Sequence, residues 1–175
     1  MLSGLILRTK ELIIIRVAKV TDADLIAKII VSCWQNAYTG IVDPAYPVRL
    51  SVDKFTGIFK NIILDSKQTV FVYEENGTVI GFISGILNSG KYDAEVKGLY
   101  VKPENQGFGV GKKLLDYMKQ FFVSTGSRTM IIWTLFGAKN NTFYMANGGD
   151  ARNRKLLKIG DKQYEGIGFS YKLTK

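Results

Sequence analysis

The sequence predicts an α/β fold with a mixed sheet of six to seven strands and helices on both of its faces. Runs rich in β-branched residues alternate along the chain with runs whose apolar residues recur at helical spacing. One strand, one helix and another strand follow one another between residues 93 and 136. Such a crossover makes the two strands parallel neighbours, whereas hairpins elsewhere add antiparallel strands, so the sheet must be mixed.

The first third of the chain predicts a strand followed by two helices. Residues 11–20 are dense in β-branched side chains and predict the strand. Thr21 is expected to cap a helix that runs to about Gln35, because apolar residues then follow at helical spacing. A loop with one glycine and two prolines separates this helix from a second helical pattern over residues 51–64.

The middle of the chain predicts a hairpin, a strand and a long helix. Two β-rich runs surround Asn76-Gly77, which is the strongest short signal for a hairpin turn. The strand over residues 93–101 must end before Pro103. The following helix is expected to end at Gly126. Its predicted inward-facing residues are Leu114, Leu115, Met118 and Phe121.

The last part predicts one more strand, a short helix and a closing hairpin. An apolar run over residues 129–136 predicts a buried strand, and residues 140–149 predict a short helix ended by glycines. Residues 154–173 complete the sheet as a hairpin. Its edge strands make a homodimer an expectation.

Length and composition indicate one globular domain. The 175 residues suffice for a single core, and 46% hydrophobic with 22% charged residues excludes a disordered chain. We expect an N-terminal extension over residues 1–13 and one domain over residues 14–175. No apolar run approaches the ~20 residues of a membrane span, and charged residues interrupt the N-terminal apolar run, so we expect no membrane association and a cytoplasmic location.

Residue types restrict the possible chemistry. The chain has no histidine and one cysteine, which removes the usual zinc sites and every Ser-His or Cys-His nucleophile, so no metal is expected. Cys33 lies in an apolar helical stretch and is interpreted as a core residue. Acid–base chemistry must therefore use carboxylates, tyrosines, lysines or water. The net charge of +9 comes almost entirely from residues 91–175, which either bind an anion or form a solvated basic face.

Three alternating glycines stand where a strand becomes a helix. Gly107, Gly109 and Gly111 permit positive φ angles and close approach of a ligand, and the helix start offers unpaired N–H groups with Lys112 beside them. A phosphate-bearing ligand is the natural candidate, and a glycine-rich helix entry without a ligand is the alternative. The Walker A and dinucleotide fingerprints both fail in their spacing, so neither nucleotide class is indicated.

The same stretch resembles the core motif of the GCN5-related N-acetyltransferase (GNAT) superfamily. That motif reads approximately L-Y-V-x-P-x-x-Q/R-G-x-G-x-G/A-x-x-L. The resemblance extends over roughly residues 14–173, because the order of the elements also agrees with the family. The residues that match in register are Leu99, Tyr100, Val101, Pro103, Gln106, Gly107, Gly109, Gly111 and Leu114.

The resemblance implies that acetyl-coenzyme A binds here. Backbone amides from Gln106 to Lys112 would hold the pyrophosphate, and the strand Leu99–Val101 would pair with the pantetheine arm. A bulge in this strand would open a gap towards the strand at 129–136, and the N–H of Tyr100 or Val101 would stabilise the oxyanion. The predicted cofactor contacts are Leu99, Tyr100, Val101, Gln106, Gly107, Phe108, Gly109, Val110, Gly111, Lys112 and Phe143.

Two residues are candidates for proton transfer by this resemblance. Glu95 lies where many family members place a glutamate and is the expected base through a water, although it could instead be an exposed partner of Lys97. Tyr144 belongs to an F-Y-x-x-x-G-G signature and would protonate the coenzyme A sulfur, or else fill the gap between helix and sheet. Ala138 replaces the asparagine that usually precedes this tyrosine, which leaves one cofactor contact in question.

Trp34 and Tyr38 resemble an aromatic element at the first helix exit of many bacterial family members. They lie four residues apart and share a helix face, so they would either line the acceptor site or belong to the core. The predicted function is transfer of acetyl from acetyl-CoA to a primary amine of a small molecule or peptide. The alternatives are an acyl-CoA sensor of the same fold and a nucleic-acid binder using residues 152–158, which lack interleaved aromatics.

Overall fold

The computed structural model describes residues 12–38, 40–65 and 67–174, and its centre is one mixed sheet. The strands of this described part lie in the order β1-β2-β3-β4-β5-β7-β6. Every pairing is antiparallel except that of β4 with β5, which confirms the mixed α/β sheet. The strands are β1 (Ile13–Val17), β2 (Gln68–Glu75), β3 (Thr78–Ser89), β4 (Tyr92–Val101), β5 (Thr129–Leu135), β6 (Asp150–Ile159) and β7 (Lys162–Lys172).

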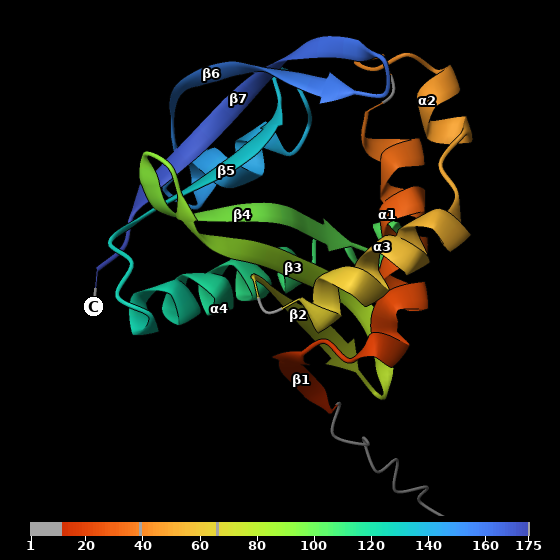
Figure 1. Ribbon diagram of the computed structural model, residues 1–175, viewed down its shortest axis with the longest axis horizontal. Coiled ribbons are helices and arrows are strands. Elements are labelled where there is room, and N and C mark those ends of the chain that lie inside the picture. Colours follow the sequence, from red (N-terminus) through yellow and green to blue (C-terminus); the bar gives the residue numbers. More distant parts are fainter. Residues whose placement is uncertain (1–11, 39, 66, 175) are drawn as a thin grey trace, which may run out of the picture.

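Helices cover both faces of the sheet (Figure 1). Two of them, α1 and α3, pack on one face of β2 and β3, whereas α4 packs on the opposite face. Figure 1 shows α1 and α3 grouped at one end of the molecule and α4 running below the sheet. The helices are α1 (Ala23–Ala37), α2 (Ala45–Val48), α3 (Val52–Leu64), α4 (Val110–Ser124) and α5 (Asn141–Ala146), with 3₁₀ turns η1 (Val20–Asp22) and η2 (Pro103–Asn105).

Strand β2 shows why the sheet needs helices on both faces. Its side chains alternate between the two sides, as strand geometry requires. Val70 and Val72 belong to the core under α1 and α3, whereas Phe71 and Tyr73 belong to the core under α4. All four are nearly inaccessible to solvent, so the run is apolar without the alternation expected of a half-exposed strand.

The hairpin between β2 and β3 confirms the sequence prediction. Asn76 and Gly77 both have positive φ, 49° and 79°, as the tight turn favoured between twisted strands requires. The pairing then continues to the register Gln68↔Ile86. This hairpin lies between β1 and β4 in the sheet, and β3 is the strand that pairs with β4.

The structure corrects three details of the helices. The 3₁₀ turn η1 occupies the position predicted for a Thr21 cap, and α1 begins at Ala23, because the Asp22 carboxylate bonds to Arg16 and to the N–H of Lys19. In α4, Phe122 is fully buried whereas Phe121 is only partly so. The loop predicted after α1 contains the short helix α2.

The predicted domain boundary falls at the start of β1. Residues 1–11 of the predicted extension lie outside the described residues, and Ile13 already pairs with Glu75 in the sheet. In the stretches 12–38, 40–65 and 67–174 the structure has no helix that is both long and apolar enough to cross a membrane.

A charged triad joins β1, η1 and β2. The Arg16 guanidinium donates to Asp22 at 2.7 and 3.0 Å and to Glu74 at 2.6 and 2.8 Å. Burial by itself raises the pKa of Asp22, but the hydrogen bonds from Arg16 and from the Lys19 N–H outweigh it and lower that pKa below its usual value.

This lowered pKa predicts a stability loss in acid. A carboxylate with a depressed folded-state pKa stabilises the fold above its unfolded pKa, near 4, and this stabilisation disappears as the pH falls through the folded value. We expect Asp22→Asn to lower the free energy of unfolding by about 1–3 kcal/mol at pH 7. The difference from the unchanged protein should shrink below about pH 4, as urea unfolding at several pH values would measure. An equal difference at pH 7 and pH 3 would contradict the assignment.

Candidate active site

A bulge in β4 opens the centre of the sheet. Lys97 is an extra residue in the pairing of β4 with β3, where Ser84 pairs with Gly98 but the next pair is Gly85 with Val96. The parallel pairing with β5 covers only residues 94–96, opposite residues 130–132. Beyond this point the two strands diverge, as Figure 1 shows. Because the bulge bends and twists β4, the edge of residues 97–101 facing β5 has no ladder partner in the described chain.

The glycine stretch lies at the open end of this gap. Gly107 and Gly109 have φ angles of 84° and 83°, a conformation that glycine adopts without strain, and Gly109 is the N-cap of α4. The Gln106 side chain donates to the carbonyl of Val101 at 2.9 Å and so ties the loop to the end of β4. Phe108 is 76% exposed. The loop therefore presents the N-terminus of a long helix to the gap, which is where an anion is stabilised.

Three elements meet behind this loop. A Cβ placed on Gly111 would lie 3.5 Å from the ring of Phe143 and 3.8 Å from Val101, so α4, α5 and β4 are in close contact there. Val110 is buried, whereas the Lys112 ammonium is exposed and bonds to Asp116 one turn later. Leu99 packs against the core under α4. The structure thus brings the predicted cofactor residues together along one edge of the gap.

Tyr144 lies in the core between α5 and β7. It is 3% exposed, and its ring packs against Phe143 and Phe169. Its hydroxyl makes no hydrogen bond to another residue within the described ranges. Burial raises the pKa of Tyr144 well above its usual value, and the phenols of Tyr38 and Tyr100 raise it further. Tyr144 therefore keeps its proton at neutral pH and can donate it, but cannot act as a base.

Glu95 precedes the bulge and pairs with the residue that forms it. Its carboxylate accepts a hydrogen bond from Lys97 at 2.9 Å, and its side chain is only 13% exposed. The predicted alternative of a pair with Lys97 is therefore present, but the carboxylate is mostly buried rather than exposed. Lys155, whose ammonium lies over the ring of Trp133, also interacts electrostatically with Glu95.

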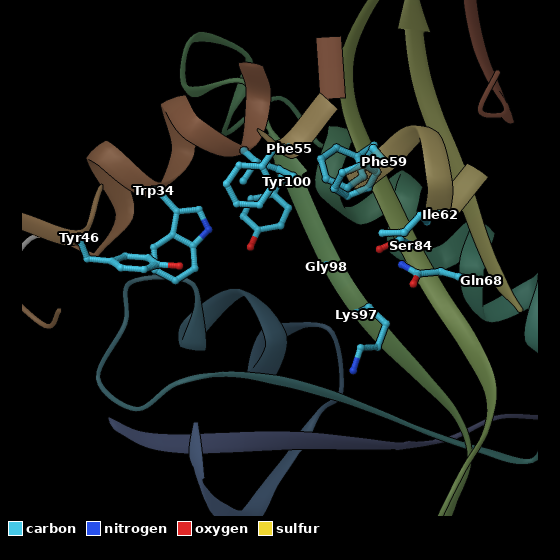
Figure 2. Close-up of a pocket in the computed structure, with 12 residues that line it drawn as sticks. Trp34, Tyr46, Phe55, Phe59, Ile62, Gln68, Ser84, Lys97, Gly98 and Tyr100 are labelled. Carbon is cyan, nitrogen blue, oxygen red and sulfur yellow. The ribbon is translucent and has the colours of Figure 1, made fainter. Parts of the chain in front are cut away.

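A cavity of about 330 Å³ lies between the sheet, α1 and α3, on the other side of β4 from the α4 core. Figure 2 shows its aromatic side chains above Gly98 and Lys97. Trp34, which the sequence predicts to line the acceptor site or to belong to the core, is one of its walls, and Tyr100 is another. The lining residues are Ile30, Trp34, Tyr46, Phe55, Phe59, Ile62, Gln68, Phe82, Ser84, Lys97, Gly98 and Tyr100.

Tyr38 lies beside this cavity without lining it. Its ring contacts Trp34 at a centroid distance of 4.4 Å, and it is buried with Leu135 and Ala138 in a small cluster. Burial raises the pKa of Tyr38, and hydrogen bonding with Thr134 and Asn140 opposes this effect. Tyr38 thus connects the end of α1 to the end of β5, across the mouth of the gap.

In the turn after β5, the side chains of both asparagines make hydrogen bonds to nearby residues of the chain. Asn140 accepts a hydrogen bond from Thr134 at 3.1 Å. Asn141 donates to the carbonyl of Leu135 and accepts from the N–H of Gly137. Ala138 is buried among apolar residues. These side chains shape the turn that leads into α5 and so position Tyr144.

Several lining residues were not predicted from the sequence. Phe55 and Phe59 belong to the helical pattern predicted over residues 51–64, but their spacing does not reveal that this face of the helix meets a cavity. Tyr46 comes from the segment predicted to be a loop, and α2 brings its ring to 5.4 Å from that of Trp34. Ser84 is one small residue in an apolar strand, and no local pattern distinguishes it.

Comparisons with known proteins agree with this geometry. Residues 66–148 match the sequence profile described as an acetyltransferase (GNAT) domain. An uncharacterised N-acetyltransferase, YuaI of Bacillus subtilis (strain 168), is 32% identical over 164 residues, which are 91% of this chain and 93% of the relative.

Two solved structures share the fold. The PaiA N-acetyltransferase from Thermoplasma acidophilum, in complex with coenzyme A, has a TM-score of 0.77 at 22% identity and covers 91% of this chain and 98% of its own. The acetyltransferase YncA from Salmonella typhimurium, with acetyl-CoA, has a TM-score of 0.68 at 21% identity and covers 93% and 95%. At 22% and 21% identity, the similarity of this chain to these two structures is evidence of a shared fold alone.

Proposed function

This chain belongs to the GNAT acetyltransferase family, and on that basis we propose that it transfers the acetyl group of acetyl-CoA to a primary amine by direct attack in a ternary complex. One observation carries the proposal. The only parallel pair in the described sheet, β4 with β5, separates at the Lys97 bulge, beside a glycine turn that presents a helix N-terminus. An extended thioester with a pyrophosphate at one end fits such a gap.

We assign the donor to the side of the gap next to α4. The backbone N–H groups from Gln106 to Lys112 bind the pyrophosphate, because the helix dipole and the unpaired amides both favour an anion. The free edge of Leu99–Val101 pairs with the pantetheine arm. The side chain of Phe143 packs behind this loop against Gly111. PaiA with coenzyme A and YncA with acetyl-CoA are relatives in fold that bind such a molecule.

The chemical step needs a neutral amine, a stabilised oxyanion and a proton for the leaving thiolate. The amine nitrogen attacks the thioester carbon, the carbon–sulfur bond breaks, and the amine proton leaves through water to Glu95. The N–H of Tyr100 or Val101 donates to the oxyanion, and Tyr144 donates to the sulfur. This assignment matches the protonated state in which burial holds the phenol of Tyr144.

A covalent intermediate on Cys33 is disfavoured. The Cys33 thiol donates to the carbonyl of Val101 at 3.1 Å, and its side chain is buried. Burial raises the pKa of this thiol to about 11, so that almost none of it is a thiolate at neutral pH. Direct attack by the amine on the bound thioester therefore accounts for the transfer without a second acyl carrier.

The donor site can be tested with a matched pair of glycine variants. Gly109 and Gly126 flank α4, have φ angles of 83° and 88°, and face open space. We expect Gly109→Val to raise the Kd for acetyl-CoA at least about tenfold, since it strains the loop by about 1–2 kcal/mol. Gly126→Val should lose similar stability but keep the Kd. Equal effects of both variants on the Kd would remove the loop from the donor site.

Activity itself is measured as release of coenzyme A thiol when acetyl-CoA and a set of primary amines are supplied. Amine-dependent thiol release supports the transferase. Binding of acetyl-CoA at the Gly109 loop without thiol release for any amine would instead identify a sensor of the same fold.

A further inference from the structure

The walls of the cavity beside β4 are mainly apolar. Six of its twelve lining residues are aromatic and two more are isoleucines. These walls come from α1, α2, α3 and the sheet, and several belong to the buried core. Its volume of about 330 Å³ is near the lower limit for small-molecule sites. A single ring with a short chain therefore matches the space better than a peptide segment does.

The charges around the cavity are unfavourable for a second cation. Among the described residues that line it there is no carboxylate, and its one charged residue is Lys97, which bonds to Glu95. An ammonium group buried here would lose its hydration without gaining a carboxylate partner from the lining. Attraction to the aromatic faces would offset part of that loss. The lining therefore disfavours polyamines, whose tails carry further ammonium groups.

A carboxylate on the acceptor would also lack a partner. The Lys97 ammonium already donates to Glu95 at 2.9 Å, which compensates its charge. The remaining polar groups of the lining are hydroxyls, an amide, the indole N–H of Trp34 and the backbone at Gly98, none of which carries a positive charge. An amino acid with a free carboxylate would have to break the Lys97–Glu95 pair to be neutralised.

Ser84 places a hydroxyl at one end of the cavity. Ser84 is 2% exposed, and within the described parts of the chain its hydroxyl makes no hydrogen bond. Ser84 lies opposite Gly98, beside the bulge where β4 leaves β5. Figure 2 shows its oxygen directed into the cavity. Because this hydroxyl borders the cavity, it can accept a hydrogen bond from a ligand that enters at this end.

We propose that the acceptor is a primary amine whose remaining part is aromatic or branched and uncharged, and that Ser84 accepts a hydrogen bond from its nitrogen. The inference rests on the proposed acetyl transfer and names its acceptor class. The apolar part lies among the aromatic walls, and the nitrogen lies at the Ser84 end with its lone pair towards the gap. Acetylation then forms the new carbon–nitrogen bond, releases the thiol and leaves a neutral amide.

The proposal is tested with three acceptors of different charge. Phenethylamine has an aromatic tail, spermidine adds further ammonium groups, and phenylalanine adds a carboxylate. We expect kcat/KM for phenethylamine to exceed that of either other amine at least about tenfold, a difference of about 1.4 kcal/mol in transition-state binding. Binding is measured separately as quenching of tryptophan fluorescence, because Trp34 lines the cavity.

Two isoleucines of α3 give a matched pair of variants. Ile62 lines the cavity, whereas Ile58 is 39% exposed on the same helix and does not line it. Ile62→Asp should shift the preference at least about tenfold from phenethylamine towards spermidine, and Ile58→Asp should not. Ser84→Ala should lower kcat/KM for phenethylamine about tenfold with the Kd for acetyl-CoA unchanged.

The outcomes distinguish the proposed acceptor class from the proposed acetyl transfer. Preference for spermidine or phenylalanine, or no binding of phenethylamine, overturns the inference. An unchanged preference in Ile62→Asp also overturns it. A third outcome is that phenethylamine binds selectively, that Ile62→Asp abolishes this binding, and that no amine causes thiol release. This result supports the ligand class proposed for the cavity and overturns the proposed acetyl transfer.

Discussion

Tyr144→Phe is expected to lower kcat about 100-fold while the Kd for acetyl-CoA stays unchanged. The change removes the only polar atom of a side chain that is otherwise packed against Phe143 and Phe169, so the fold should tolerate it. Loss of a proton donor in the transition state costs about 10²–10⁴ in rate. Steady-state kinetics of thiol release with equilibrium binding of acetyl-CoA would measure both quantities.

The pH dependence gives this prediction a second readout. Burial raises the pKa of Tyr144 well above its usual value. Its ionisation should therefore produce no descending limb in the rate profile up to about pH 10, the usual pKa of a tyrosine. Were Tyr144 a base instead, activity would rise only as it lost its proton.

A neighbouring tyrosine serves as the control. The Tyr171 hydroxyl donates to the backbone carbonyl of Tyr144 at 3.2 Å, and the Tyr171 side chain is buried in the same core. Tyr171→Phe should change stability by about 1 kcal/mol and leave kcat within about twofold. If Tyr144→Phe and Tyr171→Phe had equal effects on kcat, packing rather than proton donation would explain both.

Gly149→Ala is expected to be the most damaging small change to the fold. A Cβ at this position would lie 2.9 Å from the backbone oxygen of Tyr144, from the Cβ of Phe169 and from the Tyr171 hydroxyl. Neither the backbone oxygen nor the Cβ of Phe169 can move freely, so α5 or β7 must shift. We expect a loss of about 2–3 kcal/mol, as for overpacked cores, which corresponds to a melting temperature roughly 4–12 °C lower.

The same substitution at Gly57 should act in the opposite direction. Gly57 lies within α3, is exposed and faces open space. Gly57→Ala should therefore stabilise the protein by about 0.5–1 kcal/mol, because alanine is the better helix former. Thermal unfolding of both variants measures the contrast. A neutral Gly149→Ala would show that the contact of α5 with β7 relaxes easily.

The sequence alone determined most of the elements and the glycine loop of the proposed donor site. The Asn76-Gly77 turn and the crossover from β4 to β5 depend on residues close together in the chain, and both were predicted from local patterns. Gly107 and Gly109 were also predictable from the local sequence, because a positive φ angle is a property of a single residue. The family resemblance followed from the same contiguous motif.

Only the tertiary structure revealed the cavity that we propose as the acceptor site. Trp34, Phe55, Ser84 and Tyr100 come from four separate elements, and each has an ordinary role in its own pattern. Their shared cavity lies where α1 and α3 pack over β3 and β4, beside the one-residue bulge at Lys97. Local periodicity specifies which face of an element is apolar, whereas the partner of that face, or the space left beside it, depends on packing between segments far apart in the chain.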